Sequence, residues 1–190
     1  MLMGLPGIKI AFPSSAADFK GLLIESIREP NPVVFFADLM LLGKKGDVPE
    51  GAYSIEFGKA DVKREGTDVT VVAIGSTVPQ ALEVADQLAE TGVSVEVIDP
   101  RTLVPFDWDA VAKSVSKTGR LVAVDPNRET CGAASEIITQ AVERCWSQLK
   151  AQPQRVTWPN VPMPYSPPLE KAVVSDLDDI RRAIELTLKS

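Results

Sequence analysis

The feature that most constrains the fold is a regular alternation of short apolar runs with longer segments of helical periodicity. The runs are rich in β-branched residues and almost continuously apolar, which is typical of strands buried on both faces. They are Ile8–Phe12, Val33–Phe36, Val69–Ile74, Val93–Ile98, Leu121–Val124 and Arg155–Thr157. The helical segments are Ala16–Arg28, Pro79–Glu90, Trp108–Val115, Ala133–Leu149 and Asp176–Leu188. This order predicts βαβ units and a mostly parallel sheet covered by helices on both faces.

The segments divide the chain unevenly. Residues 61–190 hold four of the strands and four of the helices, enough for a core of their own. Residues 1–40 hold only a strand, a helix and a strand, which cannot bury both sheet faces, so we expect the end of a larger domain. Residues 41–60 are expected to be a linker, with a short strand at Tyr53–Phe57. The proline-dense stretch Trp158–Pro168 predicts a rigid, extended surface loop without helix.

Polar residues and glycines mark the expected helix ends. Ser14 or Ser15 is placed to cap the first helix, Asp107 the third and Ser175 the last. Gly92 is placed to end the second helix in the left-handed conformation, and Gly119 is placed to end the third.

The chain contains no histidine, which limits its chemistry more than any motif does. Histidine is the commonest general base and metal ligand near neutral pH. Its absence excludes a Ser-His-Asp triad, a Cys-His pair and a His-ligated zinc within this chain. No pair of carboxylates has a spacing that indicates acid–base catalysis.

Charge and cysteine usage narrow the expected surroundings. The net charge is −6 and no dense Lys/Arg cluster is present, so no nucleic-acid partner is expected. Cys131 and Cys145 are interpreted as buried thiols in a reducing compartment. No segment is long and apolar enough for a membrane span, and the start does not resemble a signal peptide. We therefore expect a soluble, cytoplasmic protein without membrane contact.

Three loop ends after predicted strands each allow a functional and a structural interpretation. The segment Ile74–Thr77 can hold an anion at a helix start, or be a plain turn and cap. Arg101 can bind a phosphate or carboxylate, or pin two loops together. A polar cluster consists of Asp125, Arg128, Glu129 and Cys131. The structural interpretation is favoured at all three, and the three tryptophans are interpreted as core or interface anchors.

A family resemblance is carried by four segments in order. They are PGIKIAFPSSAADFKGLLIESIREPNPVVFF, GKADVKREGTDVTVVAIG, VSVEVIDPRTLVPFDWDAV and VTWPNVPMPYSPPLE. Together they resemble the C-terminal part of the beta subunit of thiamine-diphosphate-dependent 2-oxo acid dehydrogenases, a group with pyruvate, branched-chain 2-oxo acid and acetoin branches. The segment LVAVDPNRETCGAASEI is closest to the acetoin branch, since pyruvate-type relatives usually carry a histidine where Asp125 stands.

The resemblance implies a fold and a division of labour. The expected fold is an α/β, transketolase C-terminal-domain-like three-layer α/β/α arrangement with a mostly parallel sheet, after a strand–helix–strand remnant of the pyrimidine-binding domain. The parent enzyme would decarboxylate a 2-oxo acid or cleave acetoin and acylate lipoamide. The family's catalytic glutamate and histidine would lie upstream of Gly4, and the alpha subunit would hold most of the thiamine diphosphate and magnesium. We therefore expect an inactive fragment without catalytic or cofactor-binding residues.

The resemblance also implies a metal segment and partners. Some family members bind potassium through backbone carbonyls in the segment that matches Ser26, Glu29 and Asn31, and here a weak or empty site is expected. The implied partners are the alpha subunit, a second beta subunit and the dihydrolipoyl acyltransferase core. Lys150 stands where some relatives have an acid for docking that core. The remaining acidic run, which could attract a basic partner, is Asp176, Asp178 and Asp179.

Two alternative functions stay open at the level of sequence. One is a free-standing anion-binding or regulatory module that uses the loop ends at Gly75 or Asp125. The other is a pure assembly domain. Fold class alone does not separate them from a dehydrogenase fragment.

Overall fold

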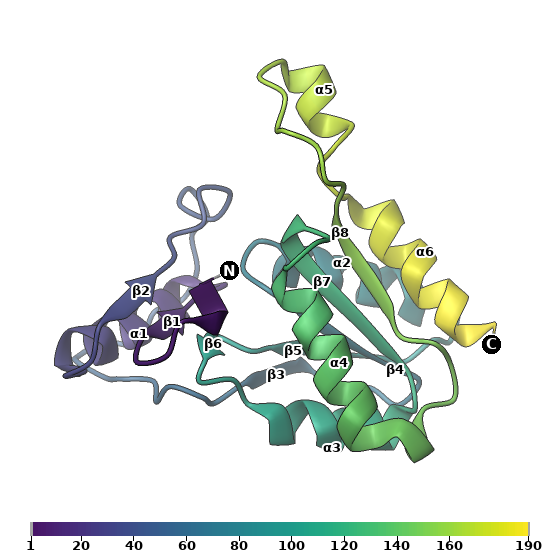
Figure 1. Cartoon of the computed structure of the whole chain (residues 1–190), viewed down its shortest axis with the longest axis horizontal. Coiled ribbons are helices and arrows are strands. Elements are labelled where there is room, and N and C mark those ends of the chain that lie inside the picture. Colours follow the sequence, from purple (N-terminus) through teal and green to yellow (C-terminus); the bar gives the residue numbers. More distant parts are fainter. Residues whose placement is uncertain (1, 190) are drawn as a thin grey trace.

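The computed structural model of the chain describes residues 2–189 and contains two sheets flanked by helices (Figure 1). Its elements in chain order are η1 (Leu2–Gly4), β1 (Lys9–Ala11), α1 (Ala16–Arg28), β2 (Val33–Phe35), β3 (Asp61–Arg64), β4 (Val69–Ala73), α2 (Thr77–Ala89), β5 (Val95–Asp99), β6 (Thr102–Val104), α3 (Trp108–Thr118), β7 (Leu121–Arg128), α4 (Ala133–Cys145), η2 (Trp146–Gln148), β8 (Gln154–Trp158), α5 (Pro167–Lys171) and α6 (Leu177–Leu188). None of the described helices is both long and apolar enough to cross a bilayer.

The larger sheet has five strands in the order β3-β5-β4-β7-β8. β4 pairs in parallel with β5 and β7, and β8 extends the parallel set beside β7. Only the edge strand β3 is antiparallel, against β5. The predicted mostly parallel α/β sheet is therefore confirmed. After β4 the chain first forms β5 on one side of it and later forms β7 on its other side. β4 therefore lies where the strand order of the sheet reverses.

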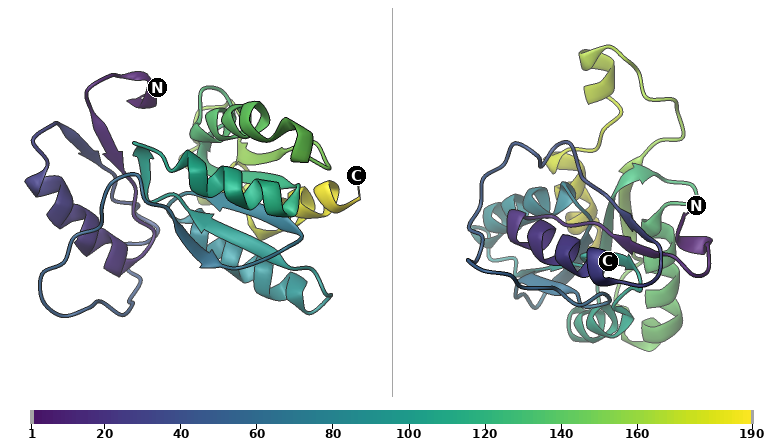
Figure 2. Two further views of the ribbon diagram at one scale, coloured as in Figure 1. Left: turned by 90° about the horizontal axis from the view of Figure 1, so that it is seen from below. Right: turned by 90° about the vertical axis from the view of Figure 1, so that its left-hand side faces the viewer.

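Helices cover both faces of this sheet, as its continuous apolar strands predict (Figure 2). On one face, Val71 and Ala73 of β4 pack with α2 and with Ile180 and Ile184 of α6. On the other face, Val72 of the same strand packs in a cluster that includes α3 and α4 residues. The alternation of side chains along β4 supplies both cores, which gives three layers.

The smaller sheet joins the beginning of the chain to its middle. β1 pairs in parallel with β2 through the crossover helix α1, and pairs antiparallel with β6 on its other edge. β6 belongs to the stretch 61–190 that was expected to form a separate sheet. The sheet that residues 2–40 begin is therefore completed by a strand from the later part of the chain. This strand connects the two sheets.

Some expectations about local structure are wrong. No strand forms at Tyr53–Phe57, while β3 and β6 form without having been expected. A short helix, α5, begins inside the proline-dense stretch, because Pro167 and Pro168 occupy its first turn, where a missing N–H costs nothing. The stretch around α5, residues 159–174, projects from the body of the molecule as an arm (Figure 1).

Most expected helix ends are confirmed. Ser15 caps α1 and Asp107 caps α3 through side-chain oxygens, and Gly119 ends α3 in the left-handed conformation. The expected cap at Ser175 is wrong, because the Asp176 carboxylate caps α6 by accepting from two backbone N–H groups, and the Asp176 N–H in turn donates to the Asp179 carboxylate.

Candidate functional site

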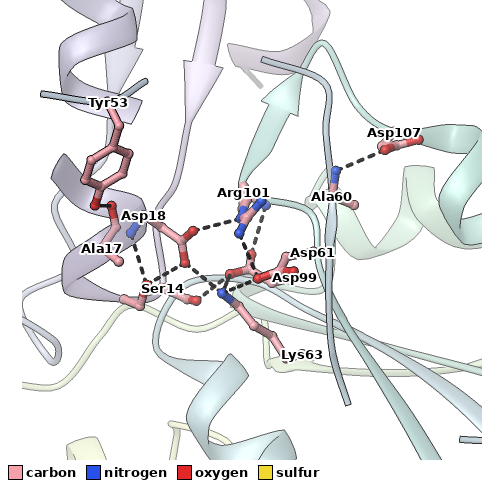
Figure 3. A network of polar contacts seen from close by, with 11 residues as sticks. Ser14, Ala17, Asp18, Tyr53, Ala60, Asp61, Lys63, Asp99, Arg101 and Asp107 are labelled. Carbon is pink, nitrogen blue, oxygen red and sulfur yellow. Dashed lines mark hydrogen bonds and ion pairs between the residues drawn. The ribbon is translucent and has the colours of Figure 1, made fainter. Parts of the chain in front are cut away.

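The most concentrated group of charged side chains lies where the two sheets meet (Figure 3). Lys63 of β3 places its Nζ 2.8 Å from Asp18 Oδ2, 2.7 Å from Asp61 Oδ2 and 3.8 Å from Asp99 Oδ2. Arg101 places its Nη2 2.7 Å from Asp61 Oδ2. Its Nε lies 2.8 Å from Asp18 Oδ1, an ion pair without hydrogen-bond alignment. These five residues are called the junction cluster.

Local structure aims each member at the junction. Asp18 stands in the first turn of α1, where Ser15 caps the helix and also donates its hydroxyl to Asp18 Oδ2. Asp61 and Lys63 are two apart on β3, so both side chains point to one face of the strand. Arg101 has a φ of 58°, and its backbone N–H donates to Asp99 Oδ1 at 2.8 Å.

Burial and pairing move the pKa values of the junction cluster in opposite directions. Burial raises the pKa of Asp18, but hydrogen bonds from Lys63 and Ser15 outweigh it and leave this pKa lowered. Burial dominates at Asp99 and raises its pKa to about 6, despite the hydrogen bond from Ser14 and the charge of Lys63. Burial lowers the pKa of Lys63, and the bonds to Asp18 and Asp61 more than reverse this.

The arrangement of the junction cluster suits holding different segments of the chain together rather than catalysis. Each cation contacts carboxylates from different segments. Arg101 therefore has a structural role, although it links α1 to β3 and not two loops as expected. Asp99 is fully buried behind Ser14. The cluster contains no histidine and no nucleophile poised beside a base, which an acid–base site would need.

The start of α2, where an anion site was the less favoured interpretation, is occupied by a carboxylate of the chain itself. The carboxylate of Asp38 accepts a hydrogen bond from the Ser76 N–H at 2.8 Å. The N–H groups of Thr77 and Val78 donate to the carbonyls of Ile74 and Gly75. The turn-and-cap interpretation therefore holds, with a cap from 38 residues earlier that the sequence did not suggest.

The polar cluster after β7 is also a capped helix start. Asp125 accepts a hydrogen bond from the Ala134 N–H at 3.1 Å, and its burial raises its pKa. Arg128 turns away and donates through Nε to the Val161 carbonyl. The expectation of two buried thiols is half right: Cys145 is buried, but Cys131 is exposed at the loop before α4.

The segment that resembles a potassium site lies at the end of α1 and in the turn after it. Ser26 donates its hydroxyl to the Leu22 carbonyl. Glu29 pairs with Lys9 and accepts two hydrogen bonds from Asn31, one from its side chain and one from its backbone. These side-chain bonds leave the backbone carbonyls as the candidate ligands.

The residues considered for docking have structural roles in this chain. Lys150 donates to the Thr118 carbonyl at 3.2 Å, and its stem packs over Gly119 at the end of α3. The Asp176 carboxylate caps α6 by accepting from the Asp179 N–H, and the Asp176 N–H donates to the Asp179 carboxylate. Asp178 is exposed.

The sequence analysis did not assign Asp18, Asp38, Asp61 or Lys63 to any site. One signal was available, namely the Asp-Val-Lys alternation in β3, which places opposite charges on one strand face. Nothing in the sequence pairs Asp38 with Ser76, because the contact depends on how the 41–60 segment returns to the sheet.

Comparison with known proteins places these features in a family. The model of the family "Transketolase, C-terminal domain" matches residues 58–180. The beta subunit of acetoin:2,6-dichlorophenolindophenol oxidoreductase from Cupriavidus necator is 43% identical over 185 residues, 97% of this chain and 55% of the relative. The pyruvate dehydrogenase E1 beta subunit of Bacillus subtilis is 43% identical over 162 residues, 85% of this chain and 50% of the relative.

A third relative, the beta subunit of 2-oxoisovalerate dehydrogenase from Bacillus subtilis, is 39% identical over 94% of this chain and 55% of its own length. The chain thus spans about half the length of the curated relatives it matches. A solved split-gene transketolase, an inactive beta4 tetramer, covers 98% of this chain and 59% of its own, with a TM-score of 0.76 and 23% identity. That likeness concerns the fold. With a family model matched over residues 58–180, the chain belongs to the transketolase C-terminal domain family.

Proposed function

We propose that the chain serves as the assembly-bearing part of the beta subunit of a thiamine-diphosphate-dependent 2-oxo acid or acetoin dehydrogenase. In this proposal the complete enzyme decarboxylates a 2-oxo acid, or cleaves acetoin, and passes the acyl group to lipoamide. The observation that carries the proposal is the 43% identity to such a beta subunit over 97% of the chain. The chain is equally identical to the acetoin and pyruvate relatives. Only the resemblance around Asp125 therefore bears on the branch of the family.

The chemistry of the described residues supports a role in assembly. Thiamine diphosphate supplies the carbanion chemistry when it is bound. A magnesium diphosphate site needs converging oxygen ligands, and residues 2–189 contain no group of three or more Asp, Glu, Cys or His side chains able to hold a metal. These residues do not fit the cofactor, so the proposal assigns it to other parts of the enzyme, chiefly the alpha subunit.

Potassium fits better than magnesium does. In a helix the Ser26 carbonyl would accept from the residue four positions later, which is Pro30 and has no N–H. This carbonyl is therefore without its helical donor at the end of α1, near Glu29 and Asn31. We propose that the three backbone carbonyls form part of a potassium site, which needs further ligands from elsewhere in the enzyme.

Exposed apolar residues support subunit contacts. Ile27 on α1, Leu39 and Met40 after β2, and Tyr165 on the arm are all largely exposed. Large exposed apolar groups are typical of interfaces. The proposed partners are the alpha subunit, a second beta subunit and the acyltransferase core, in the cytoplasm.

Calorimetric titration tests the proposal directly. Thiamine diphosphate with magnesium, titrated into the purified chain, should give no heat of binding, and the chain should show no 2-oxo acid decarboxylation. Saturable binding in the micromolar range, or turnover by the chain alone, would contradict the proposal. Isolating the native protein from its source by affinity to this chain should recover a thiamine-diphosphate-binding alpha subunit.

A further inference from the structure

The small sheet ends in an open edge at β2. The Lys9 N–H donates to the Pro32 carbonyl, so in this parallel ladder Val34 is the residue whose N–H and C=O groups point toward β1. The same alternation points the N–H and C=O groups of Val33 and Phe35 away from the sheet. No hydrogen bond joins these outward groups to another residue among residues 2–189. β2 therefore presents unpaired donors and acceptors to a further strand.

The other edge strands of the described sheets are protected against such pairing, and β2 is not. Charged side chains and prolines at an edge oppose the addition of a strand. β3 has three charged residues in four, β8 contains an arginine and is flanked by prolines, and β6 is followed at once by Pro105. β2 is the half-buried run Val33–Phe35, which has no charge and no proline. It also lies on the side of the molecule away from the large sheet (Figure 1).

The β2 strand of a second copy of this chain is complementary to this edge. In an antiparallel pair, two opposite residues of a hydrogen-bonded pair exchange both of their backbone bonds. With a two-fold axis at Val34, Val33 of each copy lies opposite Phe35 of the other, so all the outward groups of both copies are paired. Residues 31–37 carry no charge, so this register places no like charges opposite each other. Because the same strand supplies both sides, the contact closes at two copies.

We propose that two copies of this chain pair through β2, antiparallel and with the two-fold axis at Val34, into one sheet of order β6-β1-β2-β2-β1-β6. The large sheets are joined to this sheet through β6 and therefore lie at its two far ends. The contact is small, so the dimer exchanges with the monomer. The proposal rests on the edge of β2 and not on the proposed function, so either can fail without the other.

Sedimentation velocity of the purified chain tests the pairing, at concentrations from about 10 to about 500 µM. We expect the dimer fraction to rise with concentration. Val33→Pro removes an outward N–H but no bond of the β1–β2 ladder, and should weaken the dimer about tenfold or more. Val33→Ala is the matched control, since it shortens the same side chain and keeps the N–H. A monomer at every concentration, or equal effects of the proline and alanine variants, would overturn the proposal.

Engineered cysteines test the register, even if the proline variant fails to fold. Val34→Cys places two thiols at the two-fold axis, where opposite Cα atoms are about 4.5 Å apart, within the range of a disulfide. Val33→Cys is the control, since its two copies lie on a diagonal of about 7 to 8 Å, out of reach of a disulfide. Both changes are made in a Cys131→Ser background, because Cys131 is exposed.

Mild oxidation followed by denaturing electrophoresis without reductant gives the readout. The Val34→Cys variant should run as a linked dimer and the Val33→Cys control as a monomer. Equal linkage of the two variants, or no linkage of the Val34→Cys variant, would overturn the proposed pairing.

Discussion

Asp38 caps α2 from outside the helix, with its carboxylate 2.8 Å from the backbone N of Ser76 and 38 residues away in sequence. Loss of a capping carboxylate costs about 1 kcal/mol. Asp38→Ala should therefore lower the free energy of unfolding by about that amount in urea denaturation. Asp47→Ala, an exposed aspartate of the neighbouring loop, is the control and should leave stability unchanged. Equal stability of both variants would contradict the capping role.

Asp99 should make stability fall as the pH rises through mild acidity. Its pKa is about 6 in the folded protein against 3.8 as its ordinary value, because burial disfavours the charged form. The folded state thus holds this proton more tightly, and the resulting stability is complete below pH 3.8 and lost as the pH rises through about 6. The loss is about 3 kcal/mol.

Asp99→Asn should remove this dependence. Urea denaturation between pH 4 and 7 should show the stability of the parent protein decreasing relative to this variant, whose side chain stays neutral. Asp18 works in the opposite direction below pH 3.8, since its pKa is lowered, so the window is chosen above it. A constant difference across the window would contradict the assignment to Asp99.

Arg101 and Asp18 should be energetically coupled. Asp18 is buried, so Arg101→Met leaves a carboxylate in the junction with less compensation and should destabilise by roughly 3 kcal/mol. Asp18→Asn in the same background should recover part of this loss, giving an interaction energy of roughly 1–3 kcal/mol in a double-mutant cycle. Additive effects would mean that the ion pair carries no net interaction.

Gly75→Ala should destabilise more than backbone conformation alone explains. Gly75 has a φ of 56°, and an added Cβ would lie 2.6 Å from the Phe12 ring and 3.0 Å from the Asp38 carboxylate. Gly51→Ala is a control with a φ of 72° and open space around it. Both variants should lose about 1 kcal/mol from the left-handed conformation, and Gly75→Ala a further 1–3 kcal/mol, roughly, from crowding. Equal losses of stability in the two variants would show that the Phe12 ring moves aside without an energetic cost.

Potassium should have little effect on this chain by itself. The proposed carbonyl ligands at Ser26, Glu29 and Asn31 are only part of a coordination shell. Replacing sodium chloride by potassium chloride at equal ionic strength should shift the midpoint of thermal unfolding by less than about 1 °C. A larger, saturable rise specific to potassium would mean that this segment completes a site without other subunits.

The sequence predicts the large sheet well because its strands are buried on both faces. Runs such as Val69–Ile74 have to be covered on two sides, and this requirement alone predicts the three layers. β3 was not predicted because its charged side chains belong to the junction cluster and break the apolar pattern of a strand. β6 was not predicted because three residues are too few to show a hydrophobic period. α5 escaped because prolines that forbid a helix interior are tolerated in its first turn.

The site was less predictable than the fold, since its contacts depend on distant segments. The caps at Ser15 and Asp107 act within three residues and could be predicted. Asp38 and Ser76, or Lys63 and Asp18, meet only after both sheets have formed. Local patterns carry no information about such pairs, whereas the missing histidines limit the chemistry whatever the fold.

The pairing of β6 with β1 has a practical consequence for dissecting the molecule. A protease that cuts the exposed stretch between residues 41 and 52 would sever the backbone without separating the pieces. The pairing of β1 with β6, in which Ile10 lies opposite Val104, and the ion pairs around Lys63 would hold the two pieces together. Nicked protein should therefore migrate as one species under native conditions and as two after denaturation.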